Sequence, residues 1–200
     1  MLELSTLGGA TLYENAHTNV LTSYSYDRNV VRVLDQGDTD MCCVYSIAGL
    51  VELMLNMRGE LGFGNTMNTI DLFSRRADHT VAGMSFREAF DLMIDTGYKV
   101  GSACLFARGY FRIPGAELLK RYIIAYGPVL MALPVYSPDS VDFWVPHGAL
   151  RGYHGIMAVG YNAQGVELVN SYGSTWGRRG RAVLPWEDFS CVKELWGLLV

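Results

Sequence analysis

Four residues of this 200-residue chain have the types and the order needed for nucleophilic attack on a carbonyl group: Gln36, Cys42, His154 and Asn170. A thiolate is a strong nucleophile, but the leaving group still needs a proton, which an imidazole can supply. An amide oxygen can accept from the imidazole N–H and orient the ring. A glutamine amide can join a backbone N–H to form an oxyanion hole. The set therefore predicts thiol-dependent acyl chemistry, of which peptide-bond hydrolysis is the main candidate.

The elements around these residues should place them together. Cys42 lies where the polar loop 35–41 meets an apolar segment that predicts a buried central helix, and a helix N-terminus favours a thiolate. His154 precedes an apolar strand, and Asn170 closes the next strand, sixteen positions later. If these strands pair as a hairpin, the two side chains lie near each other at one end.

The pattern along the whole chain predicts an α+β protein. Helical periodicity covers 42–58, 85–97 and 116–125, with Ser85 and Glu88 forming a capping box. Short apolar runs bounded by Gly, Pro or Asn then favour strands of an antiparallel sheet or barrel, at 129–136, 154–161, 166–172 and 181–186, with a hairpin turn at 162–165.

Helices followed by strands imply two lobes with a cleft between them. We expect an N-terminal arm over 1–25 and one domain over 26–200. Within that domain, the helical lobe should cover about 42–115 and the β lobe about 116–200 plus the N-terminal segment.

Composition argues against several classes of partner. The formal charge is -4, the pI is near 5.5 and no basic stripe is visible, so we expect neither nucleic acid nor an anionic membrane surface as a partner. The start of the chain lacks the pattern of a secretory signal, and no apolar run reaches the ~18 residues of a membrane span. The four cysteines are adjacent or scattered, which fits neither disulfides nor a zinc site. Free thiols, an intracellular location and no metal or cofactor are expected.

Three ordered blocks resemble papain-like cysteine peptidases of the C1 type. They are VLDQGDTDMCCVYSIAGLVE (33–52), GYHGIMAVGY (152–161) and VNSYGSTWGRRGRAVLP (169–185), and the likeness spans roughly 26–189. The resemblance implies a two-lobed papain-like fold with a β-barrel-like second lobe and an active-site cleft between the lobes. It also implies a Cys42–His154–Asn170 triad with Gln36 in the oxyanion hole, acting on a peptide or protein substrate. Substrate-binding positions carried over from it are Tyr153, Gly155, Tyr172 and Trp176.

The chain also departs from that family. Cys43 stands where Trp or Tyr follows the nucleophile, and the carboxylate of Asp40 replaces a small residue beside it, which opposes thiolate formation. Thr39 replaces a disulfide cysteine, and Tyr172 replaces a tryptophan that shields the histidine–asparagine bond. In style the chain is closest to the bacterial or viral branch that lacks a propeptide.

These departures leave a second function open. A papain-like fold that has lost activity could serve as a binding or structural component of a larger assembly, for example a viral or phage particle, with contacts through the N-terminal arm. The location would then be virion-associated rather than cytoplasmic. Amidase or acyl-transfer chemistry on the same triad is a third reading.

Overall fold

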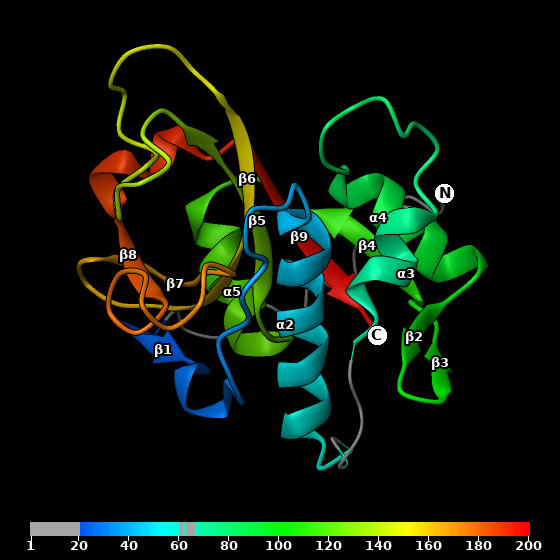
Figure 1. Ribbon diagram of the computed structural model, residues 1–200. Coiled ribbons are helices and arrows are strands. Elements are labelled where there is room, and N and C mark those ends of the chain that lie inside the picture. Colours follow the sequence, from blue (N-terminus) through cyan, green and yellow to red (C-terminus); the bar gives the residue numbers. More distant parts are fainter. Residues whose placement is uncertain (1–20, 61, 63–66) are drawn as a thin grey trace.

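The computed structural model describes residues 21–60, 62 and 67–200. The long helix α2 (Cys42–Met57) stands at the centre, with a large sheet on one side and the helices α3 (Thr69–Ser74) and α4 (Phe86–Asp95) on the other (Figure 1). This is the two-lobed α+β arrangement predicted from the sequence. Most of the predicted N-terminal arm, residues 1–20, lies outside the described residues, and so does its predicted contact with partners.

Helix α2 is the core element that both lobes share. The prediction of a buried central helix is confirmed, because ten of its side chains are buried: Cys43, Val44, Ser46, Ile47, Ala48, Leu50, Val51, Glu52, Leu53 and Leu55. Glu52 accepts two hydrogen bonds from the guanidinium of Arg32, at 3.1 and 2.5 Å. A buried carboxylate needs such a partner. The pair also ties the chain ahead of α2 to the body of the helix.

The second predicted helix, α4, begins and ends close to its predicted bounds, 85–97. The Ser85 hydroxyl accepts the Glu88 N–H at 3.2 Å and caps α4, and Gly97 follows the helix with φ 75°. The Glu88 carboxylate accepts the Ala77 N–H instead of closing the box on Ser85. The short hairpin of β2 (Tyr98–Val100) and β3 (Ala103–Leu105), like α3, was not predicted.

The large sheet has the order β4-β9-β5-β6-β7-β8, with β1 paired to β6, and all of its pairings are antiparallel. The four predicted strands are present, together with β1, β4 and β9. Residues 109–112, near the end of the stretch predicted for the helical lobe (about 42–115), pair with β9 and so belong to this sheet. The bounds are β1 (Tyr24–Ser25), β4 (Gly109–Arg112), β5 (Val129–Val135), β6 (Gly152–Tyr161), β7 (Gly165–Val169), β8 (Arg181–Pro185) and β9 (Glu194–Leu199).

Strands β6 and β7 form the predicted hairpin. Met157 lies opposite Val169, and the turn is closed by the Asn162 N–H, which donates to the Gly165 carbonyl at 2.9 Å. This register brings the start of β6 and the residue after β7 to the same end of the sheet. The other helices are α5 (Ala116–Ala125), which packs on β5 and β6, and the 3-10 helices η1 (Asp27–Asn29) and η2 (Trp186–Cys191).

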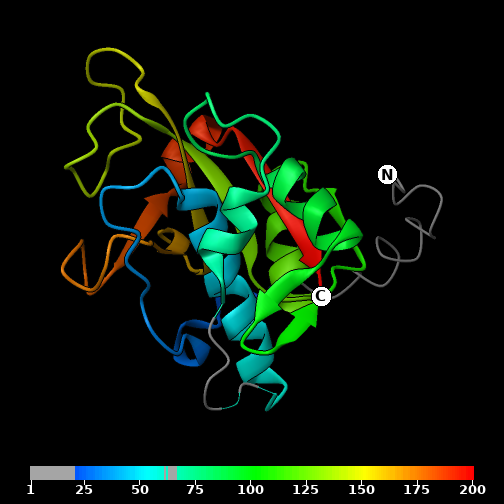
Figure 2. The same ribbon diagram turned by 45° about the vertical axis from the view of Figure 1, so that its right-hand side comes forward.

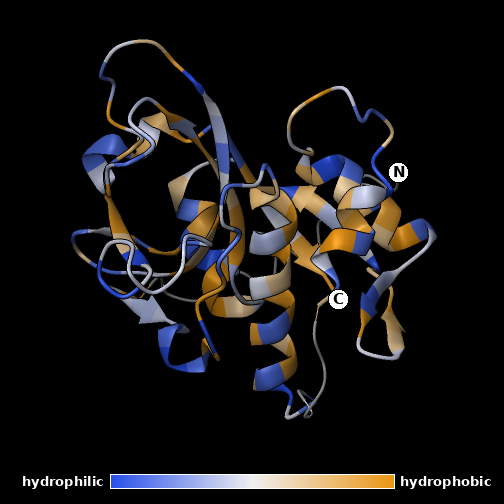
Figure 3. Ribbon diagram, in the orientation of Figure 1, coloured by the Kyte–Doolittle hydropathy of each residue, from blue (hydrophilic) through white to orange (hydrophobic). Residues whose placement is uncertain are grey.

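Apolar residues concentrate between α2, the sheet and α4, and they form one cluster that runs through both lobes (Figure 3). In both ribbon views, the N-terminal end of α2 lies beside the start of β6 (Figures 1 and 2). Within the described ranges, no helix has the length and hydropathy that a membrane span needs.

Candidate active site

Cys42 is the first residue of α2. Its N-cap residue, Met41, caps no backbone N–H with its side chain. The loop ahead of it is fixed to the segment after β7: the Gln36 N–H donates to the Ser171 carbonyl at 2.8 Å, and the Gly173 N–H donates to the Leu34 carbonyl at 3.0 Å. These bonds set the position at which the thiol begins the helix.

Gly155 lets the start of β6 come close to α2. A Cβ at this position would lie 3.1 Å from Cζ of Phe86 and 3.3 Å from both the Cα and the N of Cys43. Such distances leave little room for a side chain. Because Gly155 directly follows His154, this close approach brings the imidazole next to the helix N-terminus that carries Cys42.

His154 and Asn170 form a buried pair. The His154 Nε2 lies 2.6 Å from the Asn170 Oδ1, and the two residues are 3% and 2% exposed. The same Oδ1 accepts the Ser171 backbone N–H at 2.8 Å, which only an oxygen can do. The histidine must therefore donate through Nε2, and its neutral ring carries the free electron pair on Nδ1.

Aromatic rings enclose the imidazole. Phe143 meets it edge-on, with centroids 5.3 Å apart and an interplanar angle of 86°, and Tyr172 lies at 4.6 Å. Trp176 packs against both rings. Phe143 comes from the loop between β5 and β6, where no periodic pattern pointed to it, and it was not predicted from the sequence.

Burial controls the protonation of this pair. It lowers the pKa of His154 to about 4, against a smaller opposing effect of the bond to Asn170. Burial also raises the pKa of the Cys42 thiol; the backbone N–H of Gly155 counteracts this, and the nearby Asp40 carboxylate adds to it. The resting structure at neutral pH thus combines a thiol with a neutral imidazole.

The buried His154 predicts a specific loss of stability in acid. Its pKa rises from about 4 in the folded state to the ordinary 6.5 on unfolding, so the unfolded chain binds the proton first. The contribution of neutral His154 to the free energy of unfolding is therefore complete above pH 6.5. It is lost as the pH falls to 4, which lowers the free energy of unfolding by about 3 kcal/mol. Urea unfolding of the wild type and of His154→Gln across this range measures the effect. An equal acid loss in both proteins would contradict the prediction.

The side-chain amide of Gln36, in the loop ahead of Cys42, is held by hydrogen bonds at both ends. Its Nε2 donates to the Thr39 carbonyl at 2.6 Å, and its Oε1 accepts the Ser171 hydroxyl at 2.6 Å. One amide hydrogen remains beyond the bond to Thr39. Ser171 was not singled out from the sequence, although it stands directly after Asn170 in the third block.

The four predicted substrate-binding residues occupy different environments. Tyr153 is 50% exposed, with the Lys193 ammonium 5.6 Å from its ring centroid. Gly155 is buried against Cys43, whereas Tyr172 and Trp176 are partly buried around the imidazole. Next to the loop ahead of Cys42, a hollow is lined by 39–41, 79–83, Phe73 and Arg76.

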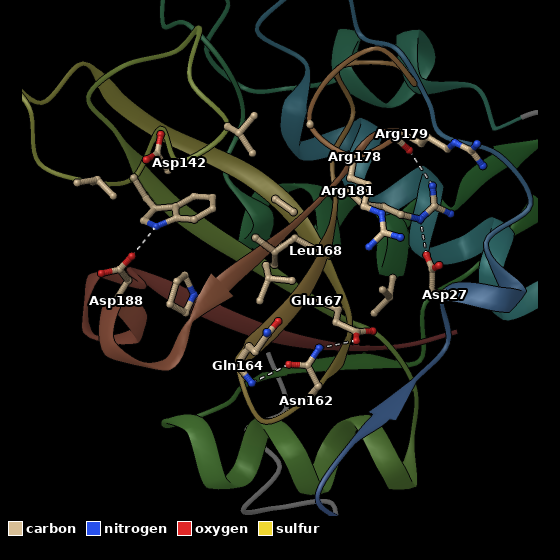
Figure 4. Close-up of a pocket in the computed structure, with 18 residues that line it drawn as sticks. Asp27, Asp142, Asn162, Gln164, Glu167, Leu168, Arg178, Arg179, Arg181 and Asp188 are labelled. Atoms are coloured by element: carbon tan, nitrogen blue, oxygen red, sulfur yellow. Dashed lines mark hydrogen bonds and ion pairs between the residues drawn. The ribbon is translucent and has the colours of Figure 1, made fainter.

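A larger hollow lies over β7 and β8 and is lined partly by Arg178, Arg179 and Arg181 (Figure 4). Arg181 donates to the Asp27 carboxylate, so this cation is already paired. The Trp144 indole N–H on its wall donates to Asp188 at 3.1 Å and anchors the loop that places Phe143 on His154. In the described part of the chain, no group of three His, Cys, Asp or Glu side chains could hold a metal ion.

Comparison with solved structures identifies the architecture. Xylellain, a cysteine protease from Xylella fastidiosa, superposes with a TM-score of 0.79 at 15% identity, over 94% of this chain and 89% of that one. The procathepsin B S9 of Trypanosoma congolense gives 0.76 at 14% identity, over 93% and 80%. The Carica candamarcensis cysteine protease CMS1MS2, in complex with E-64, gives 0.71 at 18% identity, over 90% and 99%. The chain has the papain-like fold.

A curated relative agrees with this fold. The papain-like chain is 26% identical over 185 residues to a cathepsin L-like proteinase of Fasciola hepatica. The matched region covers 76% of this chain and 55% of that proteinase. The chain thus spans about half the length of the curated relative it matches. No family model matches the sequence. The resemblance to papain-like cysteine peptidases predicted from the sequence is confirmed by these relatives.

Proposed function

We propose that this papain-like chain is a cysteine peptidase in which Cys42 is the nucleophile and His154 is the proton acceptor. The observation that carries the proposal is the buried 2.6 Å bond between His154 Nε2 and Asn170 Oδ1, at the strand end that lies against the first turn of α2. It orients the imidazole and leaves Nδ1 as the basic atom, as a histidine that must accept a thiol proton requires.

The geometry supports the following course. The Cys42 thiol gives its proton to His154 Nδ1 while the sulfur attacks the carbonyl carbon of the peptide. The Cys42 N–H and the remaining amide hydrogen of Gln36 stabilise the oxyanion. His154 then protonates the leaving amine, and the C–N bond breaks to leave a thioester. A water molecule, deprotonated by His154, attacks the thioester; the acid leaves and the thiol is restored.

The substrate in this proposal is a peptide or protein chain that binds across the face where α2 meets β6. Tyr153 presents an exposed ring one residue before His154, and a hollow borders residues 39–41, directly ahead of Cys42. Trp176 and Tyr172 would form the wall behind the histidine. A nucleophile with such surfaces next to it in the chain would suit an extended peptide.

An epoxide inhibitor that alkylates thiols tests the proposal. We expect a single covalent adduct on Cys42, located by fragmentation mass spectrometry of the peptide that contains both Cys42 and Cys43. Exposed Cys104 reports non-specific labelling. An adduct on Cys104 with none on Cys42 would contradict the proposal, because an inhibitor of this kind depends on an activated thiol.

A second function is favoured by one observation. The raised pKa of Cys42 and the lowered pKa of His154 describe a resting pair that is uncharged, as in a papain-like fold retained for binding or assembly in a larger particle. In that case, Cys42 would alkylate at the rate of an ordinary thiol with a pKa near ~8.5, with no dependence on His154. The same labelling experiment, followed against pH, separates the two functions.

A further inference from the structure

The tyrosine hydroxyl beside the candidate catalytic pair has no role in the proposed reaction as described above. The Tyr172 Oη lies 3.2 Å from the Nδ1 of His154. Because Nε2 is the donor to Asn170, the neutral ring offers Nδ1 only as an acceptor, and the tyrosine must be the donor. The hydroxyl therefore occupies the one electron pair that the Cys42 proton would need.

The position of Tyr172 is fixed by backbone contacts rather than by the hydroxyl itself. Asp35 and Tyr172 form an antiparallel bridge, and the neighbouring Gly173 N–H donates to Leu34. The ring also rests on Trp176, with centroids 6.1 Å apart at 84°. The backbone and the ring are thus held in place independently, so removing the oxygen should leave the aromatic packing intact.

From this arrangement we infer that Tyr172 is a positioning residue that holds His154 neutral, with its proton on Nε2, and thereby keeps Cys42 as a thiol until a substrate displaces the hydroxyl. The inference rests on the proposed function only in taking Cys42 as the reactive thiol. A tryptophan at this position, which the family resemblance would lead one to expect, has no hydroxyl to fill this role.

The charges around the pair are consistent with this role. Besides burial, the groups that shift the pKa of Cys42 are the backbone N–H groups of Gly155, Cys43 and Cys42 itself and the Asp40 carboxylate, and the group that shifts the pKa of His154 is the Asn170 side chain. No described cation is among them. Burial, with a further contribution from Cys42, raises the pKa of Tyr172 to about 12, so the hydroxyl stays protonated and remains a donor across the physiological range.

The test is the rate at which iodoacetamide alkylates Cys42 in Tyr172→Phe, followed by mass spectrometry from pH 5 to 10. Losing one neutral hydrogen bond should shift the thiol–thiolate balance by about three- to tenfold. We expect the rate at pH 7 to rise by that factor and the pH midpoint to fall. An unchanged or slower rate would overturn the inference.

Two controls separate this effect from general loosening. Tyr161 lies at the far end of β6, and its hydroxyl donates to the Leu21 carbonyl at 3.0 Å. Tyr161→Phe therefore removes a tyrosine hydrogen bond elsewhere and should leave the rate unchanged. In the His154→Gln background, Tyr172→Phe should have no effect, and a persistent increase there would also overturn the inference. Tyr172→Trp gives a second variant without the hydroxyl, should Tyr172→Phe unfold.

The readout also distinguishes this inference from the proposed function. Alkylation requires no peptide turnover. If neither the wild type nor Tyr172→Phe cleaves peptides, but Cys42 is alkylated faster in Tyr172→Phe and this increase depends on His154, the inference stands and the peptidase proposal fails. If peptides are cleaved and Cys42 is alkylated at the same rate in the wild type and in Tyr172→Phe, the proposal stands and the inference fails.

Discussion

Replacing Cys42 by alanine is expected to reduce peptide hydrolysis by at least about ten-thousandfold. The nucleophile forms the covalent bond, so no neighbouring group can substitute for it. Because Cys42 is partly exposed at the start of α2, the fold should be unaffected, with an unchanged midpoint of thermal unfolding. Hydrolysis of a fluorogenic peptide library, compared between wild type and Cys42→Ala, measures the loss.

The neighbouring cysteine supplies the matched control. Cys43 is 3% exposed and packs inside the core, where burial raises the pKa of its thiol well above the ordinary value. Cys43→Ala should therefore lower the free energy of unfolding by about 1 to 2 kcal/mol while hydrolysis persists. The reverse result, with activity surviving in Cys42→Ala and lost in Cys43→Ala, would place the nucleophile one residue later.

Replacing His154 by alanine is expected to lower kcat by about a hundred- to ten-thousandfold, the usual contribution of a general acid–base group. The loss should appear in kcat rather than KM, because the imidazole moves protons and does not bind the peptide. Asn170→Ala should cost less, since it acts only by orienting the ring. Steady-state kinetics on one peptide compares the three proteins.

His147 provides the control for this series. It lies exposed in the loop between β5 and β6, whereas His154 is buried at the start of β6. His147→Ala should retain full kcat. Equal losses from both histidine substitutions would indicate a general effect of the loop rather than the loss of a base.

The sequence was sufficient for those parts of the fold that depend on local patterns. The buried face of α2, the cap at Ser85 and the β6–β7 hairpin were all predicted, because their apolar periodicity and turn residues lie within a few positions of one another. Strands β4 and β9 were missed. They pair with each other, from Gly109 opposite Leu199 (199 − 109 = 90 positions apart) to Arg112 opposite Trp196 (196 − 112 = 84), and such a distant pairing leaves no local trace.

The candidate site divides in the same way. The types and spacing of Gln36, Cys42, His154 and Asn170 predicted which groups could act. The predicted β6–β7 hairpin also brought His154 and Asn170 to the same end of the sheet. The close approach at Gly155 was not visible, since it depends on how β6 packs against α2. Nor was Phe143, which arrives on a loop without periodicity.

By itself, then, the sequence determined the chemistry available to this protein: a thiol at a helix N-terminus, an imidazole and an amide in a papain-like order. Only the tertiary structure decided the protonation of the thiol and the imidazole. Residues distant in the chain pack around His154 and Cys42 and oppose charge on both, because desolvation acts through whatever packs around a group rather than through its sequence neighbours. The same packing placed the Tyr172 hydroxyl on the nitrogen that the reaction needs.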